Sequence, residues 1–209
     1  MSHVEFTKEM KKTHTILVPM MLPIHFQFLR NILCKEGYRV EILKTEGQQI
    51  IDEGLKNVHN DTCYPALLVI GQMIDALKSG KYDTAHIALA ITQTGGGCRA
   101  SNYIHLLRKA LVQAGFEHVP VISVNFSQLE KNSGFKLTPK MLLRLLYAFL
   151  YGDMLMWIKN QCKPYELEKG STDALVTTWI DTITAQFDSL SYMRMKHNYQ
   201  EMLHDFAAL

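Results

Sequence analysis

Two cysteines in this chain each follow a turn-rich loop and precede a predicted helix. Cys63 lies in Asn-Asp-Thr-Cys-Tyr-Pro-Ala, and Cys98 lies in Thr-Gly-Gly-Gly-Cys-Arg-Ala. A thiol at the start of a helix faces the positive end of the helix dipole and backbone N–H groups, which favour the thiolate form. Thiolates are the ligands that iron–sulfur clusters take from proteins. If the fold brings Cys63 and Cys98 together, the pair predicts a metal or iron–sulfur site.

Three consecutive glycines precede Cys98. Gly95, Gly96 and Gly97 allow the backbone to approach a ligand and to direct N–H groups at an anion or at a cluster. With Ala100, the turn also matches the G-x-G-x-x-A pattern, so a phosphate- or nucleotide-binding module is an alternative. That match is weak, because the turn follows the third predicted strand and no acidic residue ends the next one. A plain tight turn is the remaining interpretation.

Polar side chains near these motifs are further candidates. His25 follows the first predicted strand, where it could orient a substrate or act as an acid–base group. Arg99 and Asn102 come directly after the glycine turn, where they could contact an anion or hydrogen-bond cluster sulfides. Each of the three could equally be a packing or surface residue. The other two cysteines, Cys34 within a helical pattern and Cys162 at a helix end, are interpreted as structural.

Four short apolar runs, each followed by a helical pattern, would position these groups. The runs cover 15–20, 39–44, 86–92 and 121–126. None alternates cleanly between apolar and polar residues, which is typical of strands buried on both faces. We therefore predict an α/β fold with a three-layer, doubly wound, mostly parallel sheet in the order 2-1-3-4. Ligands bind such sheets at the carboxyl ends of strands where the order reverses, and the loop that carries Cys98 lies there.

The chain changes character after the fourth strand. Two long helical patterns follow, one from Thr138 and one from Thr172 to the end, with a break between them. The first has a wide apolar face, formed by Leu142, Leu143, Leu146, Phe149, Leu150 and Met154. We predict an N-terminal arm over 1–13, an α/β sheet domain over 14–137 and a helical extension over 138–209. The extension is expected to pack as a hairpin on the sheet domain or on a partner.

The composition is that of an ordinary globular protein. The 209 residues are 47% hydrophobic and 20% charged, with a net charge of +2, which gives no reason to expect nucleic acid or an anionic membrane as a partner. No uninterrupted apolar run approaches the ~20 residues of a membrane span, and residues 1–12 lack the apolar core of a signal peptide. We therefore expect a cytoplasmic protein whose four cysteines are reduced or metal-bound. Walker A, G-x-S-x-G and H-E-x-x-H motifs are absent from the sequence.

Several motifs together resemble the 2-hydroxyacyl-CoA dehydratase-related proteins. Besides the two cysteine motifs, they are Phe6-Thr-Lys-Glu-Met-Lys-Lys, Thr15-Ile-Leu-Val-Pro-Met-Met, Pro23-Ile-His-Phe, Gly134-Phe-Lys-Leu-Thr, Tyr151-Gly-Asp and Pro164-Tyr-Glu-Leu-Glu-Lys-Gly. Within that family the chain is similar to the C-terminal portion of the fused CoA-substrate-specific enzyme activases, also called activators of (R)-2-hydroxyglutaryl-CoA dehydratase. The resemblance implies an oxygen-sensitive [4Fe–4S] protein of anaerobic metabolism. Such dehydratases receive one electron from an ATP-driven activase and remove water from a 2-hydroxyacyl-CoA by radical chemistry.

The resemblance carries Cys63 and Cys98 over as cluster ligands, and His25 and Arg99 only as members of motifs. A [4Fe–4S] cluster usually takes four cysteines, so two ligands leave the site incomplete. The others would come from further domains or subunits of the dehydratase system, from a second copy in a homodimer that shares the cluster, or from exogenous ligands. The ATPase modules of the fused proteins have no counterpart in this sequence. Whether the chain is itself an enzyme stays open, and a non-catalytic scaffold is a further alternative.

Overall fold

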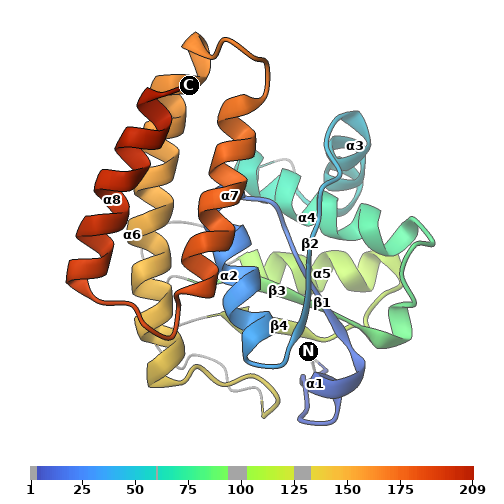
Figure 1. Cartoon of the computed structure of the whole chain (residues 1–209). Helices are drawn as coiled ribbons and strands as arrows, with labels where there is room; N and C mark the ends of the chain where they lie inside the picture. Colours follow the sequence, from blue (N-terminus) through green and yellow to red (C-terminus); the bar gives the residue numbers. More distant parts are fainter. Residues whose placement is uncertain (1–3, 60, 94–102, 125–132) are drawn as a thin grey trace. The chain divides into compact units, whose positions relative to one another are not determined.

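Four parallel strands form one sheet in this chain (Figure 1). The computed structural model describes residues 4–59, 61–93, 103–124 and 133–209. The strands are β1 (Thr15–Val18), β2 (Arg39–Ile42), β3 (Ile87–Thr92) and β4 (Val121–Val124), in the order β2-β1-β3-β4. Ile16 pairs with Val40 on one side and with Ala88 on the other, and all three strand pairings are parallel. The predicted α/β class and strand order are confirmed.

The sheet is buried on both faces. Successive side chains of a strand point to opposite faces, yet the neighbours Ile16 and Leu17 are both 1% exposed or less. All residues of β3 from Ile87 to Ile91 are buried as well. This burial explains why the apolar runs of the sequence do not alternate, as expected for parallel strands.

The described residues divide by their internal contacts into two units. The first unit comprises Met1–Met21 and Leu33–Lys136, and it contains the sheet. The second unit comprises Leu22–Ile32 and Leu137–Leu209. Most of α2 (Pro23–Lys35) therefore groups with the C-terminal helices, although α2 directly follows β1 in the sequence.

The helices of the first unit are α1 (Met10–Thr13), α3 (Gln48–Asn57), α4 (Tyr64–Lys78), η1 (Thr84–His86) and α5 (Tyr103–Ala114). The helix α4 has Pro65 in its first turn and ends before Gly80, whose φ of 71° suits glycine. Side chains of α4 and α5, among them Ile70 and Leu107, join strand residues in one fully buried cluster. The helices α3 and α4 pack with their backbones in contact, because a Cβ on Gly71 would clash with a carbonyl oxygen of α3. The buried cluster holds α4 against the sheet, and the backbone contact holds α3 against α4.

The second unit is a set of helices, with α6 (Pro139–Cys162), η3 (Lys163–Tyr165), α7 (Ser171–Ala185) and α8 (Tyr192–Ala207) beside most of α2. Thr138 caps α6 by accepting a hydrogen bond from the amide of Met141 (3.1 Å). The helical pattern predicted from Thr172 onward is two helices, because the chain turns after α7 and Ser191 caps α8. Figure 1 shows α7 and α8 beside α6, which contacts both.

The core of this helical unit contains paired polar groups as well as apolar side chains. Arg144 is 4% exposed and donates to the carboxylate of Asp188 at 2.5 Å. The amide of Asn198 donates to the hydroxyl of the fully buried Tyr151 at 2.8 Å. Such groups need partners, because a buried polar group without a hydrogen bond is costly. The two pairs therefore tie α6 to the segment after α7 and to α8.

The segment Pro139–Tyr165 is long and apolar enough to cross a membrane by length and composition alone, with a mean hydropathy of 1.4 in its most apolar window. Polar residues interrupt the segment, so it contains no uninterrupted apolar run of that length. A core helix of a water-soluble bundle meets the same criteria, and 44% of that window is buried inside the chain. A single segment of this kind is weak evidence for a membrane span.

Candidate functional site

Cys63 lies at the N-terminus of α4, as the sequence predicts. Its backbone is extended (φ −62°, ψ 145°), and its carbonyl oxygen accepts the first helical hydrogen bond, from the amide of Ala66 at 3.0 Å. The thiol does not cap its own helix and is half-buried. Because the thiol is not engaged by the helix backbone, its sulfur can interact with other groups near the helix start.

The thiol of Cys63 contacts the first residue of α5. Its Sγ lies 3.0 Å from the hydroxyl oxygen of Tyr103, which is 5% exposed and belongs to the buried cluster of the sheet unit. Either the thiol or the hydroxyl can be the donor at this distance, since both groups can donate and accept. Tyr103 follows Cys98 by five positions in the sequence. The contact therefore brings together the start of α4 and the start of α5, the two helices whose preceding loops carry the cysteine motifs.

The other residues predicted for this site lie outside the described part of the chain. They are Gly95, Gly96, Gly97, Cys98, Arg99 and Asn102. Their assignment as ligands or as a phosphate-binding turn stays a prediction. Within the described residues, no group of three or more His, Cys, Asp or Glu side chains could hold a metal ion.

A cavity of about 340 Å³ lies at the carboxyl ends of β1 and β2. Met20 and Thr45 line it after the strands, and Tyr64, the residue after Cys63, lines it from α4. Gln72 closes one side. Its side-chain oxygen accepts from the amide of Met20 (2.9 Å), and its nitrogen donates to the carbonyl of Thr45 (2.8 Å). The amide thus holds the ends of two strands together at the edge where α/β sheets bind ligands.

Sequence reasoning missed Gln72. The residue is 4% exposed within a helix that is otherwise apolar on its buried side. A lone amide among buried aliphatic residues requires partners for its donors and acceptor, and this could have indicated its bridging role.

His25 forms a pair with an acidic residue of the helical unit. Its Nε2 lies 3.0 Å from Oδ1 of Asp153, which is 128 positions away in the sequence. The imidazole side chain is only 6% exposed, whereas the carboxylate side chain is 72% exposed. The ring lies over Gly152, where an added Cβ would come within 2.5 Å of the imidazole. Solvent or a ligand can therefore reach the carboxylate of Asp153, while the buried imidazole of His25 holds that carboxylate in its orientation.

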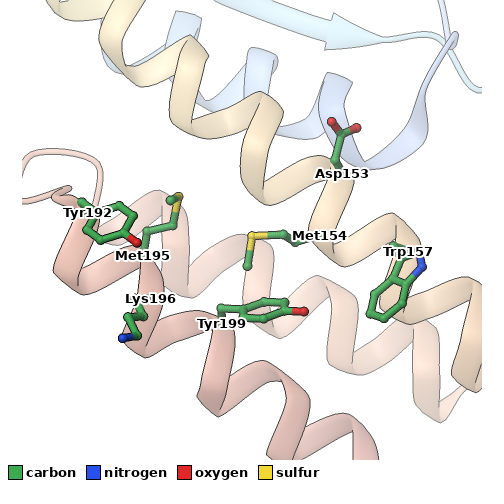
Figure 2. A pocket seen from close by; sticks show the side chains of 7 residues that line it. All are labelled: Asp153, Met154, Trp157, Tyr192, Met195, Lys196 and Tyr199. Carbon is green, nitrogen blue, oxygen red and sulfur yellow. The ribbon is translucent and has the colours of Figure 1, made fainter.

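A second cavity, of about 500 Å³, lies between α6 and α8 (Figure 2). It is lined by aromatic and thioether side chains with one charged group at each side: Asp153, Met154, Trp157, Tyr192, Met195, Lys196 and Tyr199. Figure 2 shows the ring of Tyr199 facing Met154, while the carboxylate of Asp153 points away from both. The cavity is therefore an apolar hollow and offers its carboxylate only at the rim.

The remaining cysteines differ in environment from Cys63. Cys34 is exposed on α2, so the interpretation as a packed residue does not describe its surroundings. Cys162 is half-buried at the end of α6, and its sulfur lies 3.8 Å from the carbonyl oxygen of Phe206. These two thiols are natural controls for the chemistry of Cys63.

Comparisons with protein families, with curated proteins and with solved structures give no match to this chain. The resemblance to the dehydratase-related proteins, drawn from the motifs, therefore stays a prediction. The geometry offers a thiol at a helix start that is hydrogen-bonded to a tyrosine, and the next residue in the chain, Tyr64, lines a cavity at the carboxyl edge of a parallel sheet. Such a thiol can serve as a metal or cluster ligand.

Proposed function

We propose that this chain binds, or helps to bind, a [4Fe–4S] cluster through Cys63 and Cys98. The cluster would serve electron transfer or cluster-based reduction and dehydration in a cytoplasmic 2-hydroxyacyl-CoA dehydratase or activase system. Other domains or subunits of that system are the proposed partners.

The contact between Cys63 and Tyr103 carries this proposal. It joins the starts of α4 and α5 at 3.0 Å, and Cys98 precedes Tyr103 by five residues. Five residues of chain span at most about 18 Å, and this short tether supports the proposal that Cys98 can reach the same site as Cys63. If the sulfur ligates a cluster as thiolate, the hydroxyl of Tyr103 would be the donor, and hydrogen bonds to sulfur ligands tune clusters.

Anaerobic reconstitution with iron and sulfide tests the proposal. The purified chain is expected to develop the broad visible absorbance of an iron–sulfur cluster and to retain iron and sulfide after desalting. Cys63→Ser and Cys98→Ser are each expected to abolish that absorbance and the bound iron. Cys34→Ser and Cys162→Ser are matched controls, since both change a thiol elsewhere in the chain, and they are expected to retain the cluster.

Two outcomes would overturn the proposal. One is a colourless, iron-free protein after reconstitution, with circular dichroism showing that it is folded. The other is equal iron retention by all four serine variants, which would assign the iron to adventitious binding. A nucleotide retained by iron-free protein would instead favour the phosphate-binding alternative.

A further inference from the structure

One side of α6 is apolar and exposed along most of the helix. We call it the α6 face, and it comprises Leu142, Leu143, Leu146, Phe149, Leu150, Met156 and Trp157, which are 36–56% exposed. Between Met141 and Trp157, the only other exposed position is Asp153. The opposite side of the same helix, which includes Leu145, is buried within the helical unit. With Asp153 as its single charged residue, the face has far fewer charges than usually cover the outer side of a surface helix.

The spacing along the α6 face is that of a helix-packing seam. Exposed residues follow one another at intervals of four and three: Leu142, Leu146, Phe149, Asp153, Met156 and Asn160. A flanking row repeats every seventh position: Leu143, Leu150 and Trp157. A 4-3 alternation of apolar residues is the pattern by which two helices interlock their side chains, and an occasional polar residue in the seam sets the register.

We propose that a second copy of this chain covers the α6 face, with the two α6 helices packed antiparallel about a twofold axis. The seam is complementary to itself in that orientation. Leu142 then lies opposite Asn160 of the second copy, and Leu146 lies opposite Met156 of the second copy. Asp153 lies opposite Phe149 of the second copy, so the two carboxylates do not face each other. A parallel pairing would place the two Asp153 carboxylates opposite one another, and their repulsion would weaken the dimer.

The exposed area fits a dimer of this kind. The α6 face leaves on the order of 650 Å² exposed, and Tyr192, which lines the adjoining cavity with Trp157, raises this to about 800 Å². A stable interface buries about 800 Å² on each partner. The twofold axis requires the same patch on both copies, and one continuous self-complementary seam meets that requirement.

The one acidic side chain of the face already has a partner. His25 contacts Asp153 at 3.0 Å from within the same unit, so the carboxylate keeps a hydrogen-bond donor when the face is covered. This matters because a buried charge without a partner opposes association.

Mass measurements over a concentration series test the dimer. Sedimentation equilibrium of the full chain, with reductant and chelator present, is expected to give a mass of about 48 kDa, twice the 23.9 kDa of one chain. Reductant excludes disulfide dimers through the exposed Cys34, and chelator excludes dimers held by iron. Leu146→Glu is expected to raise the dissociation constant at least about 100-fold. Leu167→Glu is the matched control, since Leu167 is 89% exposed outside the α6 face and its replacement should leave the mass unchanged.

A charge exchange tests the antiparallel register. Met156→Lys alone should weaken the dimer as Leu146→Glu does. The double variant should recover to within about tenfold of the original dissociation constant, because each new glutamate then faces a new lysine on the second copy. Within one chain these positions are ten residues apart, so they cannot pair along the helix.

Three results would overturn the inference. The first is a monomer at all concentrations up to about 100 µM. The second is Leu146→Glu lowering the unfolding midpoint without changing the mass, which would mean that the face is covered within the chain. The third is monomeric protein that floats with phosphatidylcholine–phosphatidylglycerol vesicles, which would assign the α6 face to a membrane surface.

Discussion

Replacing Gly152 by alanine tests the position of His25 directly. An added Cβ would lie 2.5 Å from Cδ2, 2.7 Å from Nε2 and 2.9 Å from Cγ of the imidazole, closer than non-bonded carbon atoms approach. The ring would have to move, and it would lose its 3.0 Å contact with Asp153. Overpacking of this kind costs about 1–3 kcal/mol and the lost hydrogen bond about 1 kcal/mol. Alanine is about 1 kcal/mol more favourable than glycine inside a helix, which offsets part of this cost. We therefore expect a net destabilisation of about 2 kcal/mol.

The same substitution should reverse its effect once the ring is removed. In a His25→Ala background the Cβ at position 152 meets no imidazole, and Gly152→Ala should stabilise the helix by about 1 kcal/mol. The two substitutions are therefore expected to couple by about 3 kcal/mol in a double-mutant cycle.

Urea unfolding followed by tryptophan fluorescence measures this coupling. The two tryptophans, Trp157 and Trp179, both belong to the helical unit, so their emission reports the unfolding of that unit. All four proteins of the cycle should be compared at one concentration, because association shifts apparent stability. If Gly152→Ala raises the unfolding free energy equally with and without His25, the ring does not lie over Gly152 and the pairing of His25 with Asp153 is refuted.

Four further substitutions test the packing inside each of the two units. Gln72→Leu leaves two backbone groups without partners, so it should cost about 2–3 kcal/mol and speed hydrogen exchange at the amide it binds after β1. Burial, and then the neighbouring His86, lower the pKa of His14. The unfolded chain therefore binds the proton at a higher pH than the folded chain, and stability falls as the pH drops below about 6.5. His14→Phe should flatten this pH dependence of stability, measured by urea titrations. Asp188→Ala should cost about 2 kcal/mol because it removes a carboxylate partner from the buried guanidinium of Arg144. Lys140→Ala removes an exposed partner of the same carboxylate and should cost under about 0.5 kcal/mol in the same assay.

The strands and most helices could be predicted because local residues determine them. The run from Thr15 is short and apolar on successive positions, as expected for a strand buried on both faces. The helix over 65–78 was predictable from Pro65 and Gly80, and the structure has it as α4 from Tyr64 to Lys78. Strand order then follows from the handedness of parallel crossovers.

The orientation of α6 could not be predicted from the same kind of pattern. Leu146 and Phe149 belong to the wide apolar face that the sequence predicts, and both are more than half exposed, while Leu145 and Leu155 are buried. The helix is apolar on both sides, so periodicity shows that it is a helix without showing which side the chain itself covers.

The partner of His25 was also beyond the sequence, because it depends on how α2 and α6 pack. The motif Tyr-Gly-Asp that contains Asp153 lies 128 positions from His25, and nothing local connects them. One signal was present. Gly152 interrupts a long helix at a cost of about 1 kcal/mol, and a glycine inside a helix indicates the close approach of another group.

The two proposals concern different units and can be combined in one measurement. Cys63 belongs to the sheet unit, and the α6 face belongs to the helical unit, so substitutions can test the two proposals separately. The iron content of a reconstituted dimer then decides where the missing ligands come from. About two irons per chain would mean that two copies share one [4Fe–4S] cluster, each donating two thiolates. About four irons per chain, retained by Leu146→Glu monomers, would mean that each chain completes its cluster with exogenous ligands, and the second copy would have no part in the site.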